Sequence, residues 1–580
     1  MRSLASRAAL LTAALLAALG PADPAPPRSV PASPSVERLV LSRELDVAVR
    51  DGRILELVVR VETDATYRAL AERFASNPSA ATAIERWNLG SGPGLPAEVR
   101  VPFALLSNEY RSLVLRNLFP EDRREGEDWI HVARSAALPL YVEGLWEVAD
   151  WFTGRGDRFP EIMAVNGLTS PELVPGQEVR VPGSLLHPSM RAGSRSADGA
   201  LEYGADERGE YAGYRLRPKE ALYSAVVLRF TGRTEAADVI ALADELARRS
   251  GIANVSDIPV GYLVKIPFDE LDPEFLPRDH PRRREAEETR RETAEALVRS
   301  PVPKTRGLEG VVVVLDAGHG GRDLGTMNHG LWEHDYVYDV AVRLKALLES
   351  ESAARVHMTI RDAQTGFEPS ATDRLVANRQ GTVLTDPPYL SREDGDAQIA
   401  VNLRWYLANS LYRKEVRGGT AADRVVFLSL HADARHPSLR GAMAYVPGAA
   451  YCAGTYGNSG RSYSGIRQVR EHPVVKFSHA ERVRAEAVSR RLADAVLGGF
   501  RAHGLPVQEI KPVRDKVVRG KQQFVPAVIR ANQIPARVLV EMVNMSNSDD
   551  AALLATRSDR ERVARALADG LFAHFGEDPR

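Results

Sequence analysis

The stretch Val311-Val-Val-Val-Leu-Asp-Ala-Gly-His-Gly-Gly321 predicts the centre of the fold and one corner of a functional site. Its first five residues form an unbroken apolar run, which is typical of a strand buried on both faces of a parallel sheet. The glycines that follow allow a sharp turn at the carboxyl edge of such a sheet, where α/β proteins place their active sites. We therefore expect an α/β domain with His319 just beyond the end of a central strand.

Two later stretches repeat the arrangement of an apolar strand that ends in a polar residue. Val425–Leu430 leads into His431, and Arg537–Val540 leads into Glu541. Between the first and second strands, Glu333 precedes a stretch whose apolar residues recur at helical spacing, so it should lie at a helix N-terminus. Because the carboxyl ends of parallel strands share one edge of a sheet, we expect these polar residues to converge.

Composition narrows the chemistry available to this edge. The chain of 580 residues has 13 histidines but only one cysteine, Cys452, which excludes an intrachain disulfide and a cysteine-rich zinc site. A metal site must therefore use His, Asp and Glu side chains. The 76 Lys and Arg residues against 77 Asp and Glu residues give a net charge of −1, and this balance excludes nucleic-acid binding by bulk basicity.

Together these stretches resemble the zinc-dependent N-acetylmuramoyl-L-alanine amidases of bacterial cell walls, from Val311 to near Phe575. The family's Gly-His-Gly-Gly motif matches Gly318–Gly321, and its Ser-x-His-Ala motif matches Ser429–Ala432. Its closing motif, a glutamate followed by Ser-Asn, matches Glu541–Asn547. The resemblance implies a mostly parallel sheet flanked by helices.

The resemblance also implies a mechanism and a substrate. If the family's residue roles apply here, His319, Glu333 and His431 bind Zn²⁺. Glu541 is then the catalytic carboxylate, which transfers the proton of a zinc-activated water. The bond cut would join the lactyl carbonyl of N-acetylmuramic acid to L-alanine. The partners implied are therefore the glycan strands and stem peptides of peptidoglycan, and the process is wall remodelling, division or cell separation.

The residues leave several alternatives open. His329 and His334 flank the acidic ligand and compete with it as imidazole donors. Asp316 and Asp433 either orient the ligand imidazoles or form turns. The catalytic carboxylate could instead be a structural ion-pair partner. At the level of function, the alternatives are a zinc hydrolase of the same fold that cuts another peptidoglycan amide, and a non-catalytic peptidoglycan-binding protein.

Two insertions lengthen the expected domain, at residues 363–398 and 447–478. Long loops in compact domains are usually functional or disordered. One hypothesis is that a loop, or the helix beginning near His479, keeps the site closed until a protein activator binds. The alternative is an ordinary surface excursion.

Three upstream segments end in the same strand pattern: Val99–Pro102, Val179–Pro182 and Val264–Pro267. In each, apolar residues alternate around a basic one and proline ends the strand. Stretches with helical apolar spacing precede each one, which predicts a strand–helix–helix–strand unit. The pattern resembles the LysM domain, a βααβ module that binds glycans containing N-acetylglucosamine. The family's Gly-Asp-Thr opening is missing in all three, which leaves open a spacer role without sugar binding.

The N-terminus predicts export. Arg2 and Arg7 precede the apolar run Ala8–Leu19, which is shorter than the roughly 20 residues of a membrane span. We expect a periplasmic or otherwise extracytoplasmic protein with no stable membrane span; an uncleaved anchor is the alternative. The predicted organisation is a signal peptide (1–22), a disordered linker (23–45), LysM-like modules (46–106, 128–186 and 213–270), a linker (188–212), a charged helical linker (273–308) and the amidase domain (310–578).

Overall fold

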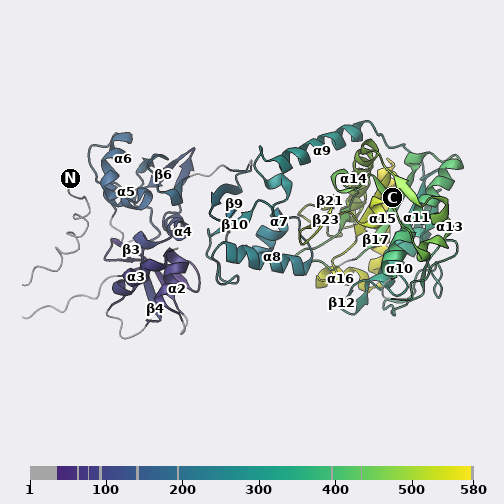
Figure 1. Cartoon of the computed structure of the whole chain (residues 1–580), viewed down its shortest axis with the longest axis horizontal. Coiled ribbons are helices and arrows are strands. Elements are labelled where there is room, and N and C mark those ends of the chain that lie inside the picture. Colours follow the sequence, from purple (N-terminus) through teal and green to yellow (C-terminus); the bar gives the residue numbers. More distant parts are fainter. Residues whose placement is uncertain are drawn as a thin grey trace, which may run out of the picture. The chain divides into compact units, whose positions relative to one another are not determined.

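The computed structural model describes residues 36–576, apart from 62–64, 76, 90–94, 139–142, 192–194, 197, 394–395 and 433. The chain divides into two compact units, Met1–Met190 and Arg191–Arg580, and Figure 1 colours them along the sequence. The predicted signal peptide and most of the predicted disordered linker lie outside the described residues. In the part that is described, no helix is both long enough and apolar enough to cross a membrane.

A six-stranded sheet forms the centre of the second unit, with the strand order β14-β11-β17-β24-β18-β21. In that order the strands are Arg355–Met358, Val312–Ala317, Val425–His431, Ala536–Glu541, Met443–Tyr445 and Val513–Arg514. The first four run parallel, β18 runs antiparallel to β24, and β21 runs parallel to β18. The predicted mostly parallel sheet is therefore confirmed, and three of its strands are the apolar stretches identified in the sequence.

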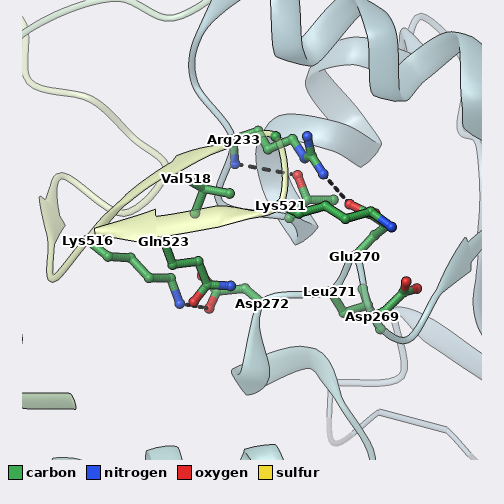
Figure 2. Close-up of a pocket in the computed structure, with 11 residues that line it drawn as sticks. Arg233, Asp269, Glu270, Leu271, Asp272, Lys516, Val518, Lys521 and Gln523 are labelled. Atoms are coloured by element: carbon green, nitrogen blue, oxygen red, sulfur yellow. Dashed lines mark hydrogen bonds and ion pairs between the residues drawn. The ribbon is translucent and has the colours of Figure 1, made fainter. Parts of the chain in front are cut away.

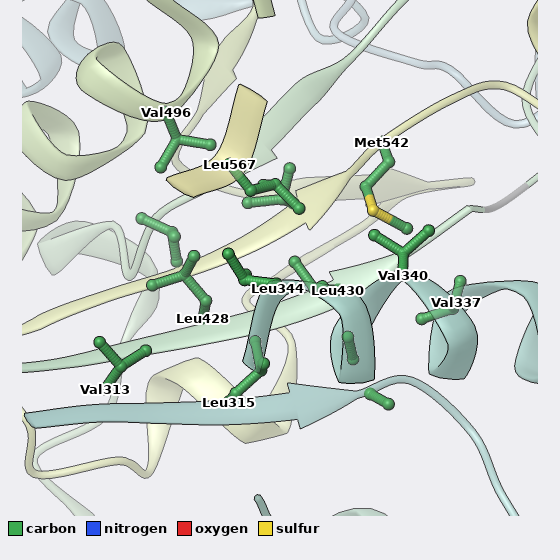
Figure 3. Close-up of a cluster of buried hydrophobic side chains, with 14 of the residues drawn as sticks. Val313, Leu315, Val337, Val340, Leu344, Leu428, Leu430, Val496, Met542 and Leu567 are labelled. Carbon is green, nitrogen blue, oxygen red and sulfur yellow. The ribbon is translucent and has the colours of Figure 1, made fainter. Parts of the chain in front are cut away.

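Helices cover both faces of this sheet. One face carries α10 (Glu333–Glu351), α14 (His479–Ala502) and α17 (Arg557–His574), and the other carries α11 (Ala397–Arg417) and α15 (Ala527–Arg530). Side chains alternate along β11 because successive residues of a strand point to opposite faces. Val313 and Leu315 pack with Leu344 of α10 (Figure 3), whereas Val312 and Val314 pack in the cluster on the other face. This double burial explains the unbroken apolar run.

Three small α+β modules precede this domain. Each has two helical segments between two antiparallel strands, as predicted. The first module (residues 36–102) has β3 (Ile54–Arg60), α2 (Tyr67–Leu70), η2 (Ala71–Ala75), α3 (Ala81–Trp87) and β4 (Glu98–Pro102). The second (residues 123–181) has β6 (Asp128–Val132), α5 (Leu145–Thr153), α6 (Phe159–Val165) and β7 (Glu178–Val181). The third (residues 201–276) has β9 (Gly209–Arg215), η7 (Leu222–Val227), α7 (Leu228–Phe230), α8 (Ala236–Arg249) and β10 (Leu263–Pro267).

Two predicted linker boundaries are wrong. The disordered linker was placed up to residue 45, but Val36–Val40 forms β1, which pairs with β2 (Leu45–Arg50). The linker at 188–212 contains β8 (Leu201–Asp206) and the start of β9. In both cases a hairpin extends the small sheet on its N-terminal side, and β5 (Arg123–Glu125) does the same in the second module.

An equivalent polar clamp supports the internal repeat. In the first module the Asn88 side chain donates to the carbonyl of Arg100 at 2.8 Å and accepts from its amide at 2.9 Å. In the second, Asn166 does the same with Arg180, at 2.7 and 2.8 Å. In the third, Ser250 Oγ accepts from a backbone amide of β10 at 2.9 Å. Each clamp ties the end of a helical segment to the closing strand.

The charged linker does form a helix, α9 (Pro281–Val298), and it packs along α14 (Figure 1). Arg491 of α14 donates to the carbonyls of Leu297, in the last turn of α9, and Ser300, just beyond its end, at 2.9 and 2.8 Å. His479 Nε2 lies 2.8 Å from a carboxylate oxygen of Glu292. The linker is thus attached to the domain that it precedes.

Candidate metal centre

The first histidine of the site lies just beyond the end of β11. Ala317, the last residue of β11, pairs with Leu430 of β17, and His319 follows two residues later with a positive φ of 67°. Gly318 is needed for the close approach of the next strand, because a Cβ atom there would lie 2.6 Å from His431 Cε1. The Gly-His-Gly-Gly sequence therefore permits two imidazoles to approach one another.

Glu333 is the first residue of α10 and is almost fully buried, with 1% of its side chain exposed. Two backbone amides fix its carboxylate: the amide of Ala432 donates to Oε1 at 3.1 Å and that of Thr326 to Oε2 at 3.0 Å. Gly325 makes room for it, since a Cβ atom there would lie 2.6 Å from Oε2. The carboxylate therefore holds one orientation, beneath the histidines.

The three residues converge on one point. His319 Nε2 lies 3.0 Å and His431 Nδ1 3.3 Å from the same oxygen, Oε1 of Glu333. One ligand atom from each residue lies within 4.8 Å of the others, which is close enough to share a metal ion. The structure thus brings together the three side chains that the sequence singled out.

The chemistry of this donor set fits a divalent cation. Two imidazoles and one carboxylate are the nitrogen and oxygen donors that zinc takes, and three protein ligands leave a coordination position open. The two imidazoles are 22% and 15% exposed, so the cluster is reachable from solvent. Burial opposes a charged imidazole at His319, yet the carboxylates of Glu333 and Asp323 raise its pKa to about 10. A positive charge beside the buried Glu333 carboxylate therefore stabilises it, and either a proton on the imidazole or a metal ion can provide that charge.

Glu541 lies beside this cluster rather than within it. It ends β24 and is the register partner of His431 on the neighbouring strand. Its side chain is 6% exposed, and Oε1 lies 3.1 Å from Nη2 of Arg435. The position is compatible with proton transfer at the open side of the donor set. The ion pair shows that the alternative structural role also has a basis in contacts.

The other candidates from the sequence lie outside the donor cluster. His329 is exposed. His334 is buried, its Nδ1 lies 3.2 Å from the carbonyl oxygen of Gly318, and burial lowers its pKa to about 4, so its imidazole is neutral. Asp316 accepts from Ser429 Oγ of the adjacent strand at 2.6 Å, which cross-links the sheet. Asp433 lies outside the described residues.

Asp323 also belongs to the site, although no motif in the sequence singles it out. Its Oδ1 lies 3.0 Å from Nδ1 of His319, the ring nitrogen that faces away from Glu333. Burial would raise the pKa of Asp323, but the neighbouring imidazole lowers it to about 2. A carboxylate on the far nitrogen of a ligand histidine fixes the ring and makes it a better donor. The only indication in the sequence was its position, four residues after His319 in a glycine-rich turn.

The two insertions are anchored by contacts outside the three donor side chains; in the first, the Ser391 carbonyl accepts from the amide of Arg322, just after the Gly-His-Gly-Gly turn, at 3.1 Å. Residues 363–398 include β16 (Gly381–Val383), which pairs with β15 (Ile360–Asp362). In the 447–478 insertion, the Asn458 amide and the Pro473 carbonyl both bond to the hydroxyl of Tyr406 on α11. Within the described residues, none of the hydrogen bonds of these insertions reaches the His–Glu–His cluster. These contacts give the hypothesis of a closing loop no support.

An α/β sheet with a His–Glu–His donor set at its carboxyl edge defines the class: an α/β domain whose two histidines and one buried carboxylate could hold a metal ion. Residues 313–573 match the family described as N-acetylmuramoyl-L-alanine amidase. This part of the chain is therefore similar to that family, and we refer to it as the amidase domain. The match spans the central strands and all four of the predicted site residues.

Similar proteins carry the same description. The N-acetylmuramoyl-L-alanine amidase AmiC of Escherichia coli O6:H1 is 27% identical over 281 residues, which cover 46% of this chain and 53% of AmiC. The germination-specific N-acetylmuramoyl-L-alanine amidase of Bacillus subtilis is 28% identical over 116 residues, 19% of this chain and 48% of that protein. The chain thus spans about half the length of these curated relatives.

Among solved structures, the N-acetylmuramyl-L-alanine amidase Ami1 of Mycobacterium smegmatis is similar to 46% of this chain over 98% of its own length, with 21% sequence identity and a TM-score of 0.29. Because this score is low, the domain assignment rests on the family match.

Proposed function

We propose that the protein hydrolyses the amide bond between N-acetylmuramic acid and L-alanine in peptidoglycan. The observation that carries the proposal is the convergence of His319 Nε2 and His431 Nδ1 on one carboxylate oxygen of Glu333, with Glu541 on the adjacent strand. The match of residues 313–573 to the amidase family supports this choice of bond. The cellular role proposed is remodelling of the wall outside the cytoplasm.

In this proposal His319, Glu333 and His431 hold Zn²⁺, and Asp323 orients the first imidazole. When bound, zinc supplies Lewis-acid chemistry, in that it acidifies water and polarises a carbonyl group. Both imidazoles must then be neutral, so binding of the cation displaces the proton that otherwise resides on the cluster.

Glu541 moves the proton. Its carboxylate accepts a proton from the attacking water, whose oxygen forms a bond to the lactyl carbonyl carbon. It then returns that proton to the amide nitrogen as the carbon–nitrogen bond breaks. The products are the lactyl carboxylic acid on the glycan and a stem peptide with a free α-amino group on L-alanine. Burial of Glu541 beside β17 shields this exchange from bulk water.

We propose further that the first and second modules bind glycan strands. Each exposes large apolar side chains: Trp87 and Leu89 at the end of α3 in the first, and Trp146 of α5, Val165 of α6 and Val174 before β7 in the second. Indole faces suit the apolar faces of sugar rings. If these modules are only spacers, replacing both tryptophans by alanine in the full chain will leave binding to purified sacculi unchanged.

Digestion of purified sacculi by the full chain tests the bond assignment. Mass spectrometry should find intact glycan strands and free stem peptides that begin with alanine. Cut stem peptides would instead favour a hydrolase of the same fold that acts on another amide. Absence of any product would favour a non-catalytic binding protein.

Glu541→Gln tests the proposed proton carrier. Turnover should fall by about 10²- to 10⁴-fold, the range that general acid–base groups contribute, while the zinc content stays at the wild-type level. Glu509→Gln, at an exposed carboxylate, is the matched control. A separate hypothesis is that a protein activator is required for activity. Hydrolysis of sacculi by the purified chain without any added protein would contradict it.

A further inference from the structure

The third module docks on the amidase domain next to the end of β17. The amide of His436 donates to the carbonyl of Thr234 at 2.9 Å, and the His436 ring stacks on Tyr223, with centroids 5.5 Å apart. Leu439, from the same loop of the amidase domain, is buried in the hydrophobic core of the third module. The loop that follows the second site histidine is thus also a docking surface.

Charged side chains also pair along the interface between the third module and the amidase domain, which is called the seam below. Asp272 of the third module lies 2.5 Å from Lys511 Nζ and 3.2 Å from Lys516 Nζ of the amidase domain. A cavity of about 120 Å³ lies in the seam, where Figure 2 shows the pairs Lys516–Asp272 and Arg233–Glu270 on its walls. Burial would raise the pKa of Asp272, but the two lysines lower it to about 2. The ion pairs that Asp272 forms with the two lysines therefore join the third module to the amidase domain.

One side chain connects this seam to the site. Arg435 is 4% exposed; its Nη1 pairs with Glu235 of the third module, and its Nη2 lies 3.1 Å from Glu541 Oε1. The backbone of Arg435 is fixed as well, because its amide donates to Asn544 Oδ1 at 2.9 Å. Arg519 Nη2 also lies 3.6 Å from Glu235, at the outer side of the seam.

We propose that Arg435 is a positioning residue for Glu541, and that Glu235 of the docked third module holds Arg435 in place. The third module is then a working part of the amidase active site. This inference rests on the proposed function, since it takes Glu541 as the proton carrier.

The physical argument concerns orientation. A glutamate side chain has three rotatable bonds, and fixing one carboxylate oxygen on a buried guanidinium fixes the direction of the other. A guanidinium presents its donors in a rigid fork, so a carboxylate at each end determines where the fork points. Without Glu235, the guanidinium would lose the contact that fixes its Nη1 end, and the direction and basicity of the Glu541 carboxylate would change with it.

Arg435→Gln should lower kcat by about 10- to 100-fold with KM nearly unchanged, because small misplacement of a reacting group costs up to about 10²-fold. Arg435→Lys should recover part of the loss, since it restores the charge without the fork. Glu235→Gln, at the partly exposed end of the link, should lower kcat by about 3- to 10-fold, a smaller misplacement than loss of the guanidinium. Zinc content should match the wild type in all three. Loss of the buried cation should lower the thermal stability of Arg435→Gln, so kcat is compared at a temperature at which every variant is folded.

Asp238→Asn is the matched control. Asp238 is another carboxylate of the third module that reaches the amidase domain, where it accepts from the Gly520 amide at 2.8 Å. An asparagine oxygen can still accept this bond, so docking and kcat should be unchanged. Equal losses in Asp238→Asn and Glu235→Gln would overturn the inference in favour of docking alone.

The double variant Arg435→Gln/Glu235→Gln should be no slower than Arg435→Gln, because both changes break one link. Additive losses would overturn the inference. A crystal structure of Arg435→Gln gives a readout without activity: the Glu541 carboxylate should turn while the His–Glu–His cluster stays in place. An unchanged carboxylate contradicts the positioning role, whereas a wild-type chain that cuts no amide contradicts the proposed function instead.

Discussion

Two clusters of histidine and carboxylate in this chain have opposite designs. In the second module, one imidazole lies between two carboxylates: His131 Nδ1 is 2.9 Å from Asp122 and Nε2 is 2.6 Å from Glu143. At the candidate metal centre, two imidazoles share one carboxylate oxygen of Glu333. The first cluster has no exposed side-chain surface, whereas the imidazoles of the second are partly exposed.

The difference teaches what separates a structural ion pair from a metal site. At His131 the two carboxylates lie beside opposite ring nitrogens, so the donor atoms of the three residues do not face a shared position where a metal ion could bind. Burial opposes the charge, but the two carboxylates raise the pKa of His131 to about 9, and a proton satisfies the cluster. At the metal centre the donors face one point that solvent can reach, so a cation can replace the proton.

The largest effect is expected for His431→Ala. Loss of one of three ligands should abolish both zinc binding and turnover, because two remaining donors form an incomplete site. Metal analysis and the sacculus assay measure the two effects. His131→Ala, at the other cluster, should leave zinc content unchanged, and a drop there would contradict the distinction.

His131→Ala should instead destabilise the second module, by about 3–5 kcal/mol, since removing one partner leaves buried charges unpaired. Hydrogen exchange at β6 in the full chain measures this locally. His187→Ala, a half-buried histidine near the same module, is the control and should have a much smaller effect. Unchanged protection of β6 would show that the buried cluster contributes no stability.

The pH dependence of the same module follows from the raised pKa of His131. Its stabilisation is fully present below the unfolded pKa of about 6.5 and is lost as pH rises through about 9, a difference on the order of 3 kcal/mol. The exchange of β6, corrected for intrinsic rates, should therefore show weakening between these values. His131→Gln should lack that component; an identical profile in the variant would assign the effect to other groups.

The smallest effect is expected for Asp323→Asn. The substitution keeps the shape but removes the charge that supports His319, and such changes typically cost about 10- to 100-fold in metal affinity. Competition with a zinc chelator measures the affinity. Asp157→Asn, at an exposed carboxylate of the second module, is the control. Equal affinities of Asp323→Asn and wild type would mean that Asp323 does not support the ligand.

The sequence predicted the parts of the site that lie where strands end. His319, His431 and Glu541 each follow an apolar strand, and the parallel order of β11, β17 and β24 brings them to one edge. Glu333 was placed by helical spacing at the start of α10. Because these rules are local, the convergence could be expected before any coordinates.

Other features depended on contacts that local patterns do not encode. The hairpins β1–β2 and β8–β9 extend the small modules at places where composition favoured linkers. His131 and Glu143 form a buried ion pair that no local pattern predicts. Charged and polar residues are usually exposed, so a segment rich in them looks like a linker. They can be buried when the fold supplies a partner of opposite charge or a hydrogen bond, and composition does not show this.

By itself, therefore, the sequence determined the α/β class, the repeated small modules and the four residues proposed for the chemistry, since each follows from periodicity or a short motif. Only the tertiary structure decided that Asp323 lies beside His319 and that Arg435 contacts both Glu541 and Glu235. The last link spans 200 positions of the chain. Its residues are in contact because the folded third module docks on the folded amidase domain. The complementarity of two surfaces produces no periodic pattern or short motif in the sequence, so it cannot be predicted from it.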